Sequence, residues 1–408
     1  MKTFQRLFGG TAIIAGAALL PGMALATAAN TTITSTVTVN YTDAANNAQT
    51  PLEASVAITV NLVASAPLLT SPADVDPSTE DTDVDLTYTI TSTANGPDTY
   101  NFSSADTRTN MVADATFTTP GILLGATTVA SPIAAAATVI TVPFDGNDAD
   151  SSVNGLEAGD TIVIDPTGAA EVATIDSIDE STGTTSNTVT ITLSAGTTGA
   201  FPYGTLIGER DDVIVTVTTD TITAGTSGTH SVLTTATSVD DNAVFTTQAT
   251  ATVITVRQPV LTITKFVRND TPATTFNPAV ASITVDGVDY YLAGVTGNPG
   301  DTMQYLIMID NSAAGAGAAS NIVVSDPVPQ FTSYQAGTIE LDATGTGVFV
   351  AQDDGDATDA AEFDGGANVV YVYAGAAGSA GAAGFGNGTG GTLAAGEISY
   401  IRFDVAID

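Results

Sequence analysis

The sequence predicts an all-β protein. In one short run after another, apolar residues alternate with threonine, serine and asparagine, as they do in half-buried strands. Clusters of Gly, Asp, Asn and Pro separate these runs and are typical of turns. Beyond the first 26 residues, no segment has apolar residues at the 3.6-residue period of a helix, so we expect little helix. The 408 residues suffice for two or three domains.

Charge and composition exclude several classes of protein. The chain carries 8 Lys and Arg residues against 44 Asp and Glu residues, a formal net charge of −36. Nucleic acids and anionic membrane surfaces repel such a chain, so we expect neither as a partner. With 43% hydrophobic and only 13% charged residues, the chain is not a disordered acidic tail. It contains no cysteine, so cores, main-chain ladders and any bound cations have to stabilise it.

The first 26 residues have the three parts of a secretory signal peptide. Lys2 and Arg6 supply positive charge, Thr11–Leu20 is apolar, and Ala24-Leu25-Ala26 fits a small-x-small cleavage site. We expect cleavage after Ala26, or after Ala28 at an overlapping site. A membrane anchor needs about 20 apolar residues in succession, and glycine and proline interrupt this run. The predicted location is therefore extracellular or on the cell surface, with no membrane span in the mature chain.

Residues 27–66 are predicted to form an N-terminal β-hairpin. Apolar residues fall on one face of each strand: Ile33, Val37, Val39 and Tyr41 in the first, and Val56, Ile58, Val60 and Leu62 in the second. A turn over Asp43–Thr50 joins the two strands. Because two strands alone are marginally stable in water, we expect this pair to dock on another sheet.

Residues 67–257 are predicted to form a first β-sandwich. A strand over Val84–Ile90 is followed by the turn Asn95-Gly96-Pro97-Asp98, and closing strands are expected at His230–Ser238 and Val244–Val256. From about residue 126 to 208 the pattern changes to short strands joined by Gly and Asp turns, which indicates a small inserted β-barrel. Such an insertion costs little, because closure entropy grows only with the logarithm of loop length.

Residues 258–408 are predicted to form a second β-sandwich, and its most informative stretch is Gly297–Pro329. A strand with apolar alternate residues ends at Asp310-Asn311-Ser312, and a second apolar run, Ile322–Val324, stops at Asp326-Pro327. The last strand is expected near the C-terminus, where apolar residues alternate again.

This order of turn, strand, asparagine-containing break, strand and Asp-Pro-x-Pro resembles the conserved repeat of bacterial and archaeal surface proteins known as domain of unknown function eleven. The resemblance covers Leu261–Asp408 well and Leu68–Val256 more loosely. It implies tandem immunoglobulin-like β-sandwiches and a location on the cell surface, but it does not indicate any particular chemical activity. In that family, the strand corresponding to Glu397–Asp408 is normally followed by a further hairpin.

The run Gly375–Gly391 consists largely of Gly, Ala and Ser. Such a composition is typical of flexible segments. We therefore predict a flexible surface loop inside the second sandwich.

His230 is the only histidine, and we expect no catalytic role for it. A Ser-His-Asp triad or a multi-histidine metal site needs partners that the sequence does not indicate. The residues around it, Thr226 to Ser231, are typical of a turn that enters a strand. Glycosidases use two carboxylates that lie close together. In a chain with so many acidic residues such a pair can arise anywhere, so it gives no evidence for this activity. The chain is therefore predicted not to be an enzyme.

Two acidic loops are candidate Ca²⁺ sites. Each spaces oxygen ligands two residues apart around a glycine, and Ca²⁺ takes about six to eight oxygens. The candidate ligands are Asp145, Asn147, Asp148 and Asp150 in one loop, and Asp353, Asp354, Asp356 and Asp359 in the other. Neither loop has the closing Glu of an EF-hand. Asp, Gly and Asn are also ordinary turn residues, so both interpretations stay open, with plain turns favoured.

The preferred function is a secreted structural protein that forms an extracellular filament, sheath or surface layer. The alternative is a cell-surface adhesin or carbohydrate-binding module. A binding module favours an exposed aromatic cluster, and Tyr290-Tyr291 is the candidate pair.

Head-to-tail β-strand donation is the hypothesis for assembly. The N-terminal hairpin is similar to the closing pair of the first sandwich, whereas the second sandwich has no such pair before Asp408. An open edge is a template for strand addition, and a heterologous contact of this kind propagates. The predicted interface residues are Val37, Val39, Tyr41, Val56, Ile58 and Val60 in the donor, and Ile401, Phe403, Val405 and Ile407 in the acceptor. The competing interpretation docks the hairpin on a sandwich of its own chain.

Overall fold

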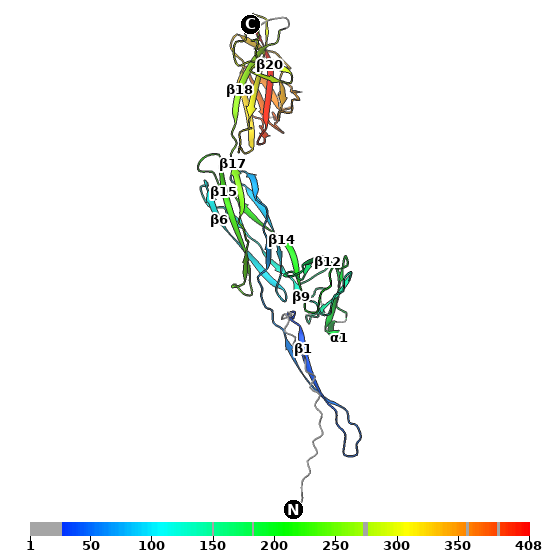
Figure 1. Ribbon diagram of the computed structural model, residues 1–408. Coiled ribbons are helices and arrows are strands. Elements are labelled where there is room, and N and C mark those ends of the chain that lie inside the picture. The colour runs from blue at the N-terminus through cyan, green and yellow to red at the C-terminus, as the bar shows by residue number, and fades with distance from the viewer. Residues whose placement is uncertain (1–26, 149–150, 182, 272–275, 356–358, 382–383) are drawn as a thin grey trace, which may run out of the picture. The chain divides into compact units, whose positions relative to one another are not determined.

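The computed structural model describes residues 27–408 except 149–150, 182, 272–275, 356–358 and 382–383, so the predicted signal peptide lies outside it (Figure 1). Within the described residues the protein is almost entirely β, and the one helix there, α1 (Gly183–Ser186), has four residues. The prediction of an all-β fold is confirmed. No helix in this part of the chain is long and apolar enough to cross a membrane.

The chain divides into two compact units. The first comprises residues 27–67, 91–99 and 123–211, and it holds the N-terminal hairpin and the inserted segment. The second comprises Leu68–Ile90, Tyr100–Ile122 and Asp212–Asp408, and it holds both sandwiches.

In the first unit, the hairpin pairs β1 (Thr32–Val39) with β2 (Leu52–Thr59), and neither strand pairs with another described strand (Figure 1). The inserted segment forms an antiparallel sheet of the order β10-β13-β12-β11-β14, with β9 also on β14. Its strands are β9 (Ala126–Thr128), β10 (Val139–Pro143), β11 (Thr161–Ile164), β12 (Glu171–Asp179), β13 (Thr188–Leu193) and the first half of β14 (Leu206–Thr218).

The inserted sheet curls around a core of its own. The N–H of Ala130, just after β9, donates to the carbonyl oxygen of Thr141 in β10 (2.8 Å), which joins the two ends of the sheet. The core is aliphatic apart from Phe201, and includes Val129, Ile140, Ile162, Val189 and Ile191. The inserted segment is therefore a small barrel-like unit.

The first sandwich, in the second unit, consists of two sheets. One contains β3 (Leu68–Thr70), β5 (Asp83–Thr91), the second half of β14 and β7 (Thr116–Thr118). The other has the order β4-β17-β15-β6-β8, with β16 on β15: β4 (Val75–Ser78), β6 (Asp98–Thr109), β8 (Gly121–Leu124), β15 (Ser227–Ser238), β16 (Phe245–Thr247) and β17 (Thr252–Arg257). Tyr88 of β5 links the sheets, because its hydroxyl donates to Gln248 and accepts from Thr234 of β15 (both 2.8 Å).

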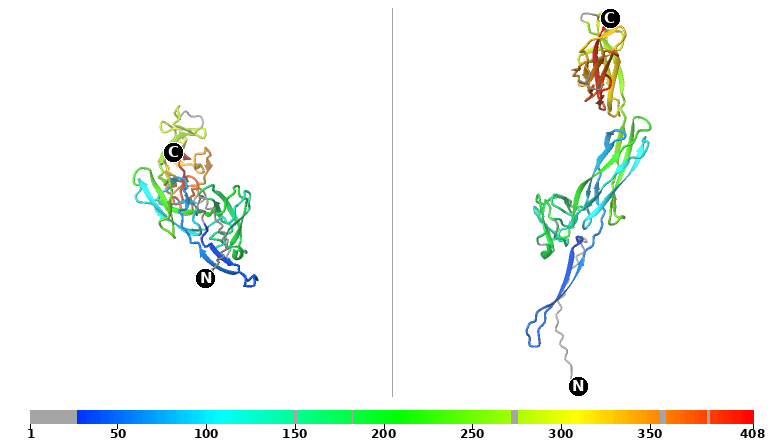
Figure 2. Two further views of the ribbon diagram at one scale, coloured as in Figure 1. Left: turned by 60° about the horizontal axis from the view of Figure 1, so that its bottom comes forward. Right: turned by 180° about the vertical axis from the view of Figure 1, so that it is seen from behind.

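The second sandwich also has two sheets, shown in yellow-green to red in Figures 1 and 2. The first has the order β18-β21-β29-β24-β25, with β23 on β29: β18 (Thr262–Asn269), β21 (Thr302–Asp310), β23 (Thr332–Tyr334), β24 (Glu340–Asp342), β25 (Val350–Ala351) and β29 (Ile398–Ile407). The second has the order β26-β27-β22-β28: β22 (Ala319–Pro327), β26 (Ala361–Asp364), β27 (Val369–Ala374) and β28 (Gly391–Leu393). A separate hairpin pairs β19 (Ile283–Val285) with β20 (Val288–Tyr290).

The core of the second sandwich follows the alternation read from the sequence. Met303, Ile307 and Ile309 of β21 and Phe403 and Val405 of β29 pack between the sheets. They meet the inward residues of the other sheet, among them Ile322, Val324, Val370 and Val372.

The Gly/Ala/Ser run is not the loose surface loop that composition predicts, as far as its described residues show. Ala376 and Ser379 form bridges with Thr392 and Thr389, and Ala380 is fully buried. A Cβ on Gly378 would lie 1.8 Å from the carbonyl oxygen of Tyr373. The small residues therefore allow the chain to lie directly on a neighbouring backbone.

Candidate subunit interface

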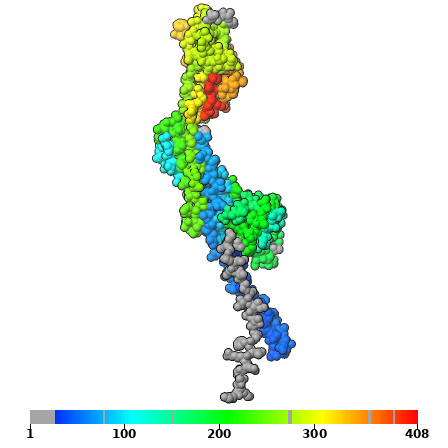
Figure 3. Space-filling view, viewed as in Figure 1, coloured from blue at the N-terminus to red at the C-terminus, as the bar shows by residue number. Residues whose placement is uncertain are grey.

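The N-terminal hairpin is a ribbon with one apolar face. Its ladder places Ile33 opposite Ile58, Val37 opposite Ala54, and Val39 opposite Leu52. The other face is polar, with threonine and serine along both strands and Glu53 opposite Thr38. Every residue of β1 and β2 is exposed, and the apolar side chains keep much of their surface: Ile33 46%, Val37 59%, Val39 51%, Leu52 60%, Val56 66% and Ile58 63%. Part of the hairpin is seen in blue in Figure 3.

A buried asparagine holds the segment that directly follows the hairpin. Asn95, in the turn after β5, accepts a hydrogen bond from the N–H of Val63 (2.7 Å) and donates to the carbonyl of Asn61 (3.2 Å). Asn311, in the turn after β21, accepts from the N–H of Val260 (3.1 Å), two residues before β18. The two asparagines thus hold equivalent segments, each of which leads from a hairpin into the first strand of a sandwich. The sequence indicated the asparagine turns but not this role.

The first sandwich contains a buried version of the same hairpin. There β15 and β17 pair antiparallel, with His230 opposite Ile254, and β15 pairs with β6 over its length. The inward side chains His230, Val232, Ile254 and Val256 have no exposed surface. The sequence Val253-Ile-Thr-Val256 in β17 matches Ala57-Ile-Thr-Val60 at the end of β2. Equivalent apolar positions are therefore buried in one hairpin and exposed in the other.

The second sandwich has an open seam where the first has β15 and β17. One wall is the outer edge of β18, which carries no described strand over Thr262–Lys265. The other wall is an edge of β22, which β28 meets only at Ala319 and Ile322. Between them lies a largely apolar groove of about 400 Å³, lined by Leu261, Ile263, Ile309, Ile322, Val323 and Val324 together with Thr262 and Ser325.

An ion pair bridges the two walls of the seam. The Lys265 ammonium lies 2.8 and 2.6 Å from the two carboxylate oxygens of Asp326. It also lies 4.2 Å from the centre of the Tyr305 ring, where the ring face attracts a cation. The one charge on each wall is thus neutralised by the other, and the groove itself is lined by apolar side chains and the uncharged Thr262 and Ser325.

The structure places the predicted interface residues in two different environments. On the donor side, Val37, Val39, Tyr41, Val56 and Ile58 are exposed, and Val60 is half-buried. On the acceptor side the prediction fails: Ile401, Phe403 and Val405 are fully buried, Ile407 is half-buried, and β29 is paired on both edges. The final strand lies in the middle of its sheet, and the edges that border the seam belong to β18 and β22.

The acidic loops use several of their carboxylates as turn caps. Asp145 accepts hydrogen bonds from the N–H groups of Asn147 (3.0 Å) and Asn154 (2.8 Å). Asp359 accepts from the N–H groups of Asp353 (2.6 Å) and Ala361 (3.0 Å).

Two further candidate ligands, Asp353 and Asp354, also accept hydrogen bonds. Asp353 accepts from the N–H of Gly355, and Asp354 from the N–H of Gly337 and the Tyr334 hydroxyl. Asp148 is exposed, whereas Asp150 and Asp356 lie outside the described residues. The described part of the chain brings no three acidic or histidine side chains together as a metal site.

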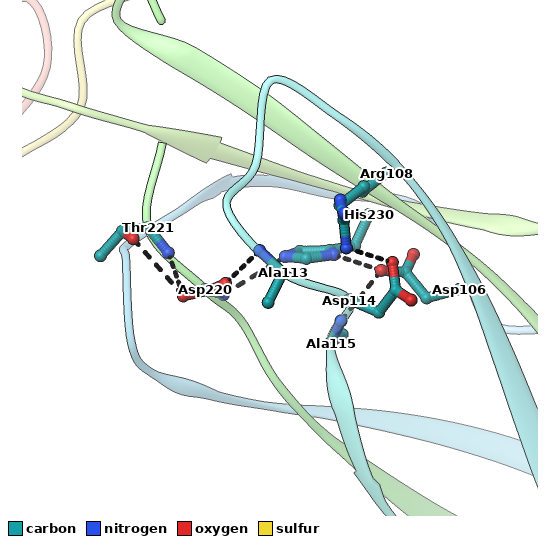
Figure 4. A network of polar contacts seen from close by, with 8 residues as sticks. All are labelled: Asp106, Arg108, Ala113, Asp114, Ala115, Asp220, Thr221 and His230. Atoms are coloured by element: carbon teal, nitrogen blue, oxygen red, sulfur yellow. Dashed lines mark hydrogen bonds and ion pairs between the residues drawn. The ribbon is translucent and has the colours of Figure 1, made fainter. Parts of the chain in front are cut away.

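His230 is a buried structural residue, with both ring nitrogens engaged (Figure 4). Nδ1 lies 2.6 Å from Asp106 Oδ2, and Nε2 accepts a hydrogen bond from the N–H of Asp220 (3.3 Å). This arrangement puts the ring proton on Nδ1 and leaves no nitrogen free to take a proton from a substrate. The pKa of Asp220 is lowered, first by the hydrogen bond from the N–H of Thr221.

Comparison with known proteins gives no assignment. A scan against protein-family models finds no match to this chain, and a search of curated proteins finds no similar sequence. The resemblance to surface-protein repeats stays a prediction. Function therefore has to be argued from the geometry of the hairpin and the seam.

Proposed function

We propose that this protein is a secreted, non-enzymatic structural subunit that polymerises head to tail by β-strand donation. The β1–β2 hairpin of one subunit fills the seam between β18 and β22 of the next. Because donor and acceptor are different surfaces, each subunit keeps one free surface of each kind, and the chain of subunits continues to grow. The products are filaments, or sheaths and layers built from filaments, outside the cytoplasmic membrane.

The observation that carries the proposal is the pair of hairpins within one chain. Ile254 is completely buried in the first sandwich, whereas Ile58, in the matching Ile-Thr-Val sequence, is 63% exposed. An isolated two-stranded ribbon with an exposed apolar face is marginally stable, and docking on a sheet removes that cost. Burying each half-exposed aliphatic side chain contributes roughly 1 kcal/mol, and new main-chain hydrogen bonds form along the edge of β22.

The binding-module alternative has less support. Tyr290 and Tyr291, the aromatic pair that would best serve a sugar site, are 0% and 7% exposed. Tyr290 is committed to the second sandwich, because its hydroxyl donates to Gln304 (2.6 Å). Export rests on the signal-peptide pattern of residues 1–26.

The proposal is tested with the mature protein and a variant that lacks Ala29–Leu62. We expect the mature protein to form polymers visible by negative-stain electron microscopy, and the truncated variant to elute as a monomer in size-exclusion chromatography. Because the truncation also removes contacts with Asn95, the double substitution Val37→Asp/Val39→Asp serves as a second donor-deficient variant with an intact hairpin base. Polymers from both variants would show that strand donation is wrong.

A further inference from the structure

We infer the register in which the donated hairpin is seated: β1 runs antiparallel to β22, with Thr36 opposite Ser325 and Thr38 opposite Val323. This inference rests on the proposed function and adds the alignment of the two strands. Register matters because a one-residue shift turns every side chain of a strand to the other face.

The first step matches β22 with β6. Each strand follows an asparagine turn, and each has an asparagine, an apolar residue and, four residues later, an aspartate: Asn101, Phe102 and Asp106 in β6, and Asn321, Ile322 and Asp326 in β22. Each aspartate binds a basic side chain: Asp106 accepts a hydrogen bond from His230, and Asp326 makes an ion pair with Lys265. Phe102, Ser104 and Asp106 therefore correspond to Ile322, Val324 and Asp326.

The second step matches the two hairpins. The shared Ile-Thr-Val sequence equates Ile58 with Ile254. Opposite these residues lie Ile33 in β1 and His230 in β15. Counting along the strands, Ser35, Val37 and Val39 of β1 then correspond to Val232, Thr234 and Ala236 of β15.

The pairing in the first sandwich gives the register. There Ala236 lies opposite Phe102, Thr234 opposite Ser104, and Val232 opposite Asp106. Transferred to the seam, Val37 lies opposite Val324 and Ser35 opposite Asp326, while Val39 reaches Ile322, where β28 already meets β22 at Gly391 and the new pairing ends. Apolar side chains then meet apolar ones, and a hydroxyl lies beside the carboxylate. The threonines of β1 face solvent.

Other registers are less favourable. A shift by one residue would turn Thr36 and Thr38 inward and expose Val37 and Val39. A shift by two residues that brings Val37 opposite Asp326 would bury a carboxylate beside an isopropyl group, which offers no hydrogen bond. The only charged residue of β1 and β2 is Glu53, on the polar face, so seating the apolar face adds no charge to the seam.

Engineered disulfides test the register directly, because the natural chain has no cysteine. Directly opposed residues of antiparallel strands have Cβ atoms about 4.5–5.5 Å apart, close to disulfide range, whereas diagonal positions are about 7–8 Å apart. Polymers of Thr36→Cys/Ser325→Cys and of Thr38→Cys/Val323→Cys are oxidised, denatured and separated without reductant. We expect both variants to give a ladder of covalent multimers, and the diagonal variant Thr36→Cys/Val323→Cys to give none beyond dimers.

Two results would overturn the inference. If the diagonal variant gives the ladder and the two opposed variants do not, the hairpin is donated in another register, while strand donation itself stands. If the opposed variants give only an internally cross-linked monomer at every concentration, the hairpin fills the seam of its own chain. Failure of the proposed function is recognised separately, because polymers then persist when Val37 and Val39 are replaced by aspartate.

Discussion

At the residue scale, single buried amides hold the segments that enter each sandwich. Asn311 has no exposed surface, and besides accepting from Val260 it donates to the carbonyls of Gly317 (2.8 Å) and Leu393 (3.1 Å). Three segments of the second sandwich therefore depend on one side chain. The turn signal was readable from the sequence, but the partners were not, because they lie up to 82 residues away.

Replacing Asn311 by Ala should lower the free energy of unfolding by about 2–4 kcal/mol. The substitution leaves buried main-chain groups without a partner, and each such group costs about 1–3 kcal/mol. Urea denaturation monitored by circular dichroism measures the change. Asn242→Ala, at an exposed position, is the matched control and should change stability by less than about 0.5 kcal/mol. Equal behaviour of the two variants would contradict the anchoring role.

Glu209 should make stability depend on pH near neutrality. Burial raises the pKa of this carboxyl group from 4.5 to about 7, and Asp160, Asp211 and Glu157 add to the effect. Between pH 4.5 and 7 the unfolded chain therefore loses this proton while the folded chain retains it, so stability falls as the pH rises through this range.

The Glu209→Gln variant isolates this contribution. We expect its melting temperature to exceed that of the natural protein at pH 7.5, and the difference to shrink towards pH 4.5. Differential scanning calorimetry at several pH values provides the comparison. A difference that does not change with pH would contradict the raised pKa.

At the element scale, alternation in the sequence located the strands but not their neighbours. The period of two put Met303, Ile307 and Ile309 on one face of a strand, and all three lie in the core. It could not indicate that β29 lies between β21 and β24, because strand order depends on pairings between distant segments. For the same reason, the sequence did not indicate that the open seam lies between β18 and β22.

Composition alone also gave a wrong prediction for the Gly/Ala/Ser run. The substitution Gly378→Ala measures how tightly this run is packed. The added methyl group would lie 1.8 Å from the carbonyl oxygen of Tyr373, so the backbone has to shift. Overpacking of this kind costs about 1–3 kcal/mol. Gly365→Ala is the control in the same sandwich, since the added methyl group would lie 3.7 Å from Phe363 Cε1, an ordinary contact distance. Unchanged urea midpoints for both variants would mean that the run is as loose as its composition suggests.

The two faces of β1 should respond differently to a charge. Val37→Asp places a carboxylate on the apolar face, where docking would bury it, and should abolish polymers. Thr36→Asp places the same charge on the neighbouring polar face and should leave polymers intact. Both side chains are exposed in the free subunit, so the melting temperature of unassembled protein should change little. Electron microscopy and light scattering give the comparison, and equal loss of assembly in both variants would argue against the facial assignment.

At the scale of the whole molecule, the protein combines strong self-repulsion with uncharged contact surfaces. A net charge of −36 opposes close association of copies at low ionic strength. The apolar face of the hairpin and the lining of the groove contain no acidic residue. Asp326, beside the groove, is neutralised by Lys265. We therefore expect assembly to be faster at 0.5 M than at 0.01 M NaCl, as time-resolved light scattering would measure. A slower rate at high salt would contradict an apolar contact.

Mixing two one-sided variants tests strand donation most directly. The donor-deficient variant Val37→Asp/Val39→Asp keeps its seam, and the acceptor-deficient variant Leu261→Lys/Ile263→Lys keeps its hairpin, with both lysines at exposed positions on the groove. Analytical ultracentrifugation should find each variant monomeric alone and the mixture limited to a one-to-one heterodimer. Polymers from either variant alone, or a mixture that stays monomeric at every concentration, would contradict head-to-tail strand donation.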